Sequence, residues 1–177
     1  MAQPISVHLF IEFPNIRTPG GNPAVIVPQR KYTSPQIFEP HPPIRFYDNG
    51  YSGISLSKAY VENFTGMPDA GTYPTLLASN TTRVATRIEW PGYLPWSQNM
   101  NVVDRSRAAN PITKGKLANN IARALYAFFQ EHRTVEPDGT ARGWEVVNIP
   151  FDRLFLLELQ HVSVGSWQPV FYYMPPQ

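Results

Sequence analysis

The chain contains no cysteine among its 177 residues. This absence excludes disulfide bridges, thiolate metal sites and cysteine nucleophiles. Charge is also sparse, because charged residues make up 16% of the chain, below the roughly one quarter usual in soluble domains. Hydrophobic residues contribute 42% and aromatic residues 13%. This composition excludes a highly charged disordered chain and indicates a soluble globular protein.

Long apolar runs and basic stretches are missing as well. No apolar run reaches the roughly 18 residues of a transmembrane helix, so we expect no membrane partner. The 15 basic and 13 acidic residues give a net charge of +2, and the basic residues are scattered. Without a basic stripe interleaved with aromatics, nucleic-acid binding is not predicted. The N-terminal segment lacks the basic region of a signal peptide, so we expect a cytoplasmic protein.

Residues that could hold a metal or cofactor are few. The four histidines show neither an H-x-H nor an H-E-x-x-H spacing, so no metal site is predicted. Lys114 and Lys116 begin a predicted helix without the preceding glycines of a P-loop. They are interpreted either as two solvated lysines or as neighbours of an anion bound at the helix N-terminus. The sequence therefore predicts no cofactor.

Proline is abundant, with 19 residues, about twice the usual share of roughly 5%. Because proline interrupts helices and central strands, we do not expect a mostly helical fold. Residues 28–43 hold five prolines and are predicted to be an extended surface loop. No proline lies from Ile112 to Glu136, and this window predicts one long helix from 113 to about 132. Thr113 is a suitable N-cap, and an apolar stripe runs from Leu117 to Phe129.

The remaining pattern predicts strands joined by turns. Residues 5–13 and 83–90 alternate between apolar and polar side chains, and 154–161 is nearly continuous apolar, as in a central strand. Further predicted elements are strands at 44–47, 144–149 and 167–173, a hairpin turn at Asn49-Gly50 that pairs 44–47 with 54–56, and a short helix at 57–64. We therefore predict a single α+β domain over residues 1–177. Its antiparallel or mixed sheet carries the long helix on one face and is joined by long proline-rich loops.

Two aromatic segments are candidate binding surfaces. The loop 90–96 places Trp90, Tyr93 and Trp96 close together between prolines, and rigid exposed rings of this kind stack on sugars, ligand rings or protein partners. The alternative is that these rings fill the edge of the core. The second segment contains Tyr47, Asp48 and Tyr51, a mixture common in carbohydrate sites, and its alternative interpretation is an ordinary β-turn.

Glu158 is the candidate for acid–base chemistry, because it lies in the apolar stretch 154–161. Burial raises the pKa of a carboxyl group, which suits a general acid or base. The alternatives are a strand end in solvent or an ion pair with an arginine such as Arg153 or Arg123. No other catalytic residue is predicted.

Residues 111–129 and 154–171 are similar to segments of uncharacterised proteins of mushroom-forming fungi. The resemblance implies an origin and a family, and it implies no activity. The leading hypothesis is a non-enzymatic, lectin-like binding protein that recognises a carbohydrate, a small ligand or a protein partner through its aromatic loops. One alternative is a small enzyme that uses Glu158. Another is a self-assembling structural protein that forms a homo-oligomer.

Overall fold

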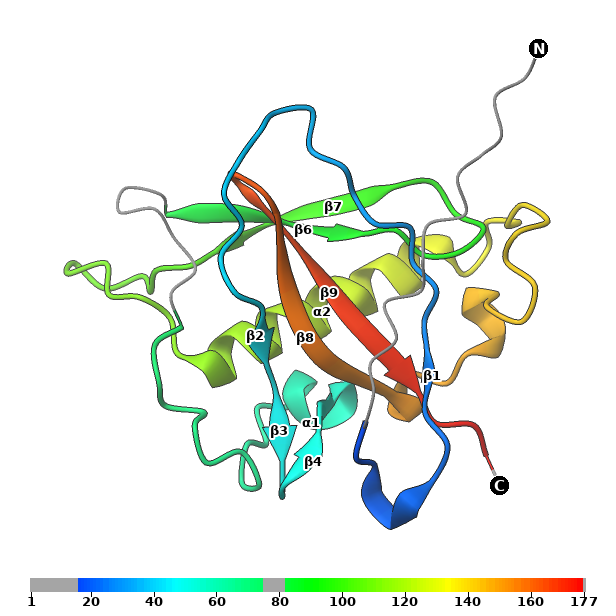
Figure 1. Ribbon diagram of the computed structural model, residues 1–177, viewed down its shortest axis with the longest axis horizontal. Helices are drawn as coiled ribbons and strands as arrows, with labels where there is room; N and C mark the ends of the chain where they lie inside the picture. The colour runs from blue at the N-terminus through cyan, green and yellow to red at the C-terminus, as the bar shows by residue number, and fades with distance from the viewer. Residues whose placement is uncertain (1–15, 75–81, 177) are drawn as a thin grey trace.

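A computed structural model describes residues 16–74 and 82–176 (Figure 1). The fold is α+β, as predicted: a mixed seven-stranded sheet and one long helix. The strand predicted at 5–13 lies outside the described residues. No helix in the described ranges is long and apolar enough to cross a membrane.

The sheet has two long central strands, β8 (Leu154–Ser163) and β9 (Ser166–Tyr173), which form an antiparallel hairpin. The strand order is β2-β8-β9-β6-β7, with β1 also paired to β9 and β5 also paired to β8. All pairs are antiparallel except β6 with β9. The remaining strands are β1 (Val25–Ile26), β2 (Ile44–Arg45), β5 (Ile54–Ser55), β6 (Arg83–Ile88) and β7 (Trp96–Asn101). The central position predicted for 154–161 is confirmed.

The helix α2 (Lys114–His132) lies across one face of the sheet (Figure 1). The side chain of Thr113 accepts a hydrogen bond from the N–H of Lys116, which confirms the predicted N-cap. The apolar stripe is fully covered, with Leu117, Ile121, Leu125 and Phe128 each 0% exposed. Burial of each such side chain contributes on the order of 1.5–3 kcal/mol, so this face anchors the helix on the sheet.

The short helix α1 (Leu56–Tyr60) packs against α2 and ends sooner than the predicted 57–64. Asn119 of α2, which is 0% exposed, ties the two helices together. Its Nδ2 atom donates to the carbonyls of Ala59 and Tyr60 at 2.9 and 3.0 Å. These carbonyls lie at the end of α1, where few backbone donors remain: the Ala59 carbonyl also accepts from the N–H of Glu62, and Asn119 completes the cap.

Asn49 and Gly50 form the predicted hairpin turn between β3 (Tyr47–Asp48) and β4 (Tyr51–Ser52). Both turn residues have positive φ angles, 51° and 75°, which a two-residue hairpin loop of this type requires. The predicted pairing of 44–47 with 54–56 is wrong. A two-residue loop pairs the residues that directly flank it, and β5 instead pairs with β8.

The strand predicted at 144–149 is also wrong. Two short 3-10 helices, η2 (Val146–Asn148) and η3 (Phe151–Arg153), follow one another in this region. The backbone finds partners in side chains: the carbonyl of Trp144 accepts from Trp90 Nε1, and the N–H of Val146 donates to the Tyr93 hydroxyl. These bonds replace the ladder that a neighbouring strand would supply.

The proline-rich segment 28–43 forms neither helix nor strand, as predicted. It is held against β8 and β9 by specific bonds. The side chain of Gln168 accepts from the N–H of Tyr32 and donates to the carbonyl of Arg30. At the other end, the N–H of His41 donates to Nδ1 of His161 at 3.0 Å, and the two imidazole rings stack. This bond needs a neutral His161, whose pKa burial lowers.

Candidate functional site

Trp90 and Tyr93 belong to the core and not to an exposed surface. Trp90 is 1% exposed and Tyr93 is 7% exposed. The Trp90 ring packs edge-on against Phe129 of α2. The loop between β6 and β7 is covered by the segment after residue 137: Gly92 has a φ of 81° and lies against the backbone of Ala141. The expectation of exposed rings is therefore corrected for these two residues, and the alternative of rings that fill the core edge describes them.

Trp96 is the one ring of this loop that reaches the surface, and it is only partly buried. Its indole Nε1 donates to the carboxylate of Glu131 at 2.7 Å, and its ring packs edge-on against Phe128. Both contacts are with α2. Trp96 is thus fixed where β7 meets the helix, and only part of its surface faces solvent.

The second predicted group lies elsewhere, on the β3–β4 hairpin, far from the loop between β6 and β7 (Figure 1). Tyr47 is 43% exposed and Tyr51 is partly buried. Asp48 accepts from Lys58 Nζ at 2.7 Å and from the side chain of Asn49 at 3.1 Å. The turn interpretation therefore describes this segment. The six predicted residues do not form one site.

Glu158 is 3% exposed and sits in an ion pair. Its Oε2 atom lies 3.4 Å from Nε of Arg45 on β2, and its Oε1 accepts from Gln160 at 2.7 Å. The partner is thus Arg45, and not Arg153 or Arg123. Glu158 lines neither of the two cavities described below.

The N-terminus of α2 is filled by the protein itself. The N–H groups of Lys114 and the next residue donate to the carbonyls of Thr72 and Ala70. Lys114 is 9% exposed, and its ammonium group pairs with Asp69. Neither earlier interpretation holds for Lys114, because it is not solvated and the N–H groups near it hold no free anion site. Lys116 remains at the surface.

A polar groove lies between β7, the loop that follows it and the outer flank of α2. Its volume is about 790 Å³. Four carboxamide side chains contribute to its walls, namely Gln98, Asn99, Asn101 and Asn120. Those of Gln98 and Asn99 are exposed and bond to no other residue in the described part of the chain. No aromatic ring lines the groove.

The charged side chains of the groove are three cations and two carboxylates. Lys116 lies 2.7 Å from Glu62, and this contact lowers the pKa of the Glu62 carboxyl group. The carboxylate of Asp104 accepts hydrogen bonds within its own loop, and those from Ser106 lower its pKa. Arg105 and Arg123 form no ion pair with any described residue. The Arg123 guanidinium does lie over the Tyr60 ring, 5.2 Å from its centre, and its charge helps to lower the pKa of Glu62. The groove therefore offers two guanidinium groups that have no carboxylate in an ion pair.

Strand β7 is the outer edge of the sheet beside this groove. Its six residues pair with β6 in unbroken register. The N–H of Ala85 donates to Gly165 on the opposite side, so the Ala85–Asn99 pair is not hydrogen-bonded and the backbone of Asn99 points outward. By alternation Ser97 and Asn101 point the same way, and the Asn101 carbonyl accepts from Asn120 Nδ2 at 3.5 Å. The backbone groups of Ser97 and Asn99 have no partner in the described ranges.

Sequence reasoning did not bring together the amides at 98, 99 and 101 and the cations that face them. The positions of Lys116, Asn120 and Arg123 on one flank of the predicted helix do indicate that their side chains lie together. The sequence pattern did not predict which strand this flank would meet.

Comparisons with known proteins give no assignment: no family model, no curated protein and no solved structure matches the chain. Within residues 16–74 and 82–176, no three His, Asp or Glu side chains gather in a way that could hold a metal ion. The function must therefore be inferred from the groove and the strand edge themselves.

Proposed function

We propose that this protein is a non-enzymatic interaction protein that binds an extended, acidic segment of a protein partner as an added strand on β7. The observation that carries the proposal is the regular, uncharged edge of β7 beside a groove with two arginines that form no ion pair with the described residues. In this binding mode, backbone hydrogen bonds supply affinity and alternate side chains supply specificity.

The edge of β7 lacks the usual protection against strand pairing. Exposed edges are commonly blocked by proline, by charged side chains, by bulges or by very short strands. The sequence of β7, WSQNMN, has no proline and no charge, and its pairing has no bulge. The far side of the sheet differs, because β2 and β5 have only two residues each. An unprotected edge with open backbone groups at Ser97 and Asn99 favours a use for it.

The charge of the groove favours an acidic partner. A strand added to β7 directs every second side chain to the α2 side of the sheet, where Lys116 and Arg123 lie. Carboxylates at those positions would pair with the guanidinium of Arg123 and, from the adjoining loop, with that of Arg105. Arginine suits this role because its planar group binds a carboxylate through two parallel bonds.

Two other occupants are less well supported. A carbohydrate site commonly includes a ring on which a sugar can stack, and no ring lines this groove. A second copy of the chain would bring its own β7 to the edge, and that strand carries no carboxylate to meet the arginines. An acidic segment complements both the backbone and the charge.

The test uses a fluorescein-labelled peptide of about ten residues in which glutamate alternates with threonine. We expect it to bind, to weaken as salt rises, and to bind better than the same peptide with lysine in place of glutamate. Asn99→Pro removes the outward N–H and should weaken binding about tenfold or more. Asn99→Thr is the matched control, since it keeps that N–H and should bind as the parent protein does.

Arg123→Gln should weaken the acidic peptide about fivefold and reduce the salt dependence. Equal binding of the acidic and basic peptides would contradict the charge argument. Unchanged binding by Asn99→Pro would contradict the strand-addition argument. A dimer that Asn99→Pro converts to a monomer would instead identify a second copy as the occupant.

A further inference from the structure

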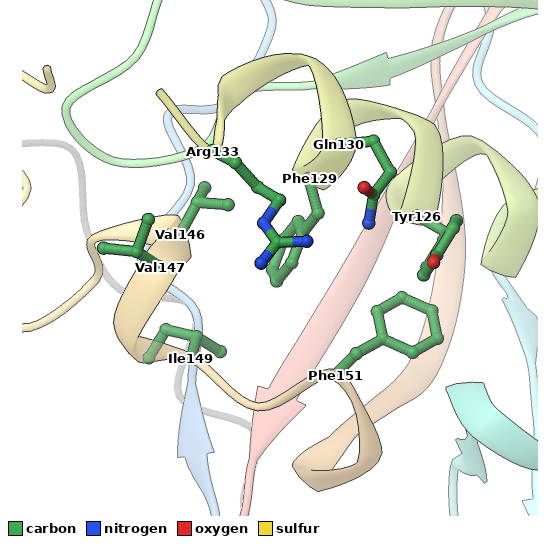
Figure 2. A pocket seen from close by; sticks show the side chains of 8 residues that line it. All are labelled: Tyr126, Phe129, Gln130, Arg133, Val146, Val147, Ile149 and Phe151. Atoms are coloured by element: carbon green, nitrogen blue, oxygen red, sulfur yellow. The ribbon is translucent and has the colours of Figure 1, made fainter. Parts of the chain in front are cut away.

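A second, smaller pocket lies between the last turns of α2 and the η2–η3 segment, and its volume is about 200 Å³ (Figure 2). Apolar and polar groups both line its walls. Phe129 and Val146 are buried, and Ile149 is 7% exposed. Phe151 closes the side nearest η3 and packs edge-on against Phe129 and Tyr126.

The polar groups of the pocket come from the C-terminal end of α2. Figure 2 shows the carboxamide of Gln130 and the guanidinium of Arg133, the residue that follows α2, both directed into the space above Ile149 and Phe151. No acidic residue lines the pocket. Arg133 forms no ion pair or side-chain hydrogen bond with the described residues. A lone cation beside packed rings is suited to an anion that carries an apolar body.

The far wall of the pocket is held in place by buried contacts. The N–H of Val146 donates to the hydroxyl of Tyr93 at 3.0 Å, and the preceding Trp144 carbonyl accepts from Trp90 at 2.7 Å. The helix wall is equally fixed, because Phe129 lies in the core. The two apolar walls are therefore in place before any ligand arrives, which lowers the entropic cost of binding, while the exposed Arg133 and Gln130 side chains become ordered only on binding.

We propose that this pocket binds a small aromatic or branched aliphatic carboxylate. The carboxylate pairs with the Arg133 guanidinium and accepts a further bond from the Gln130 amide, while the apolar body lies between Phe129, Ile149 and Phe151. The volume suits a ligand of this size, since a cavity of about 150 Å³ holds benzene. Larger ligands of drug size need roughly 300 Å³ or more.

This site is separate from the β7 edge, and it does not depend on the peptide proposal. No residue lines both the pocket and the groove. A positive result at one surface therefore says nothing about the other. Variants of Asn99 should leave carboxylate binding unchanged.

The experiment is a titration of the isotope-labelled protein with benzoate, followed by NMR, with benzamide and acetate as comparison ligands. We expect benzoate to bind with a millimolar dissociation constant, benzamide to bind about fivefold more weakly, and acetate to bind least. Shift changes should concentrate in residues 126–133 and 146–151.

Arg133→Gln should reduce benzoate binding to the level of benzamide, with benzamide itself unaffected. Arg142→Gln removes an exposed arginine outside the pocket and is the matched control for net charge. The proposal is overturned if Arg133→Gln binds benzoate as the parent does, if benzamide binds as well as benzoate, or if the shift changes map elsewhere.

Discussion

Two neighbouring proline substitutions on β7 test which backbone groups face outward. Gln98 and Asn99 are adjacent and exposed, and both carry amide side chains without partners in the described structure. They differ in backbone direction, because Gln98 is paired with Thr86 in the ladder while the N–H of Asn99 points away from the sheet. Gln98→Pro and Asn99→Pro should therefore differ greatly in stability.

The magnitudes follow from these positions. Gln98→Pro removes a ladder bond and leaves the carbonyl of Thr86, a residue that is 0% exposed, without its donor. An unsatisfied buried group costs about 1–3 kcal/mol, and the proline ring adds a steric conflict with the neighbouring strand. Asn99→Pro loses no internal bond, and proline is tolerated on an edge strand with its nitrogen toward solvent. Its cost should stay within about 1 kcal/mol.

The assay is urea unfolding followed by tryptophan fluorescence. With a slope of roughly 2 kcal/mol per molar urea, a difference of about 2 kcal/mol separates the two midpoints by about 1 M. Gln98→Thr and Asn99→Thr control for loss of the amide side chains. Equal midpoints for the two proline variants, or a greater loss for Asn99→Pro, would refute the assigned direction of the backbone.

Three further predictions concern residues that stabilise the fold and line neither the groove nor the pocket. Asn119→Ala should lower the free energy of unfolding by about 1–3 kcal/mol in urea melts, since the Tyr60 carbonyl loses its donor while the Ala59 carbonyl keeps the N–H of Glu62. The pKa of His161 is lowered in the folded protein, so its stabilising contribution is complete above about pH 6.5 and is lost as the pH falls below that value. His161→Phe should remove this part of the pH dependence of the urea midpoint, together with the bond from His41. Gly92→Ala should lower the thermal midpoint, because a methyl group at positive φ would overlap Ala141.

The main framework of the fold could be predicted where local signals agree with burial. For α2, the Thr113 cap, the apolar stripe and the absence of proline all indicate one helix, and both ends were placed correctly. Strands β8 and β9 are rich in apolar and aromatic residues and were predicted within a few residues. In these segments the residues that favour a helix or a strand are also the residues that fill the core.

The predictions were wrong in segments whose structure is decided by tertiary contacts. Strand β7 was missed because Ser97, Gln98 and Asn99 have no preference for strands, and only pairing with β6 makes them one. Residues 144–149 have a strand-like composition, yet the side chains of Trp90 and Tyr93 form hydrogen bonds with their backbone. The predicted aromatic binding surface was misplaced for the same reason, since those two rings are buried in the core.

The most direct test of the central claim is an NMR titration with the alternating glutamate–threonine peptide, combined with amide hydrogen exchange. We expect shift changes at 97–101 and along the flank of α2 at 116–124. We also expect slower exchange of the outward N–H groups of Ser97 and Asn99 when peptide is bound. Shift changes confined to other strands, or unchanged exchange at these two amides in the saturated complex, would contradict strand addition at β7.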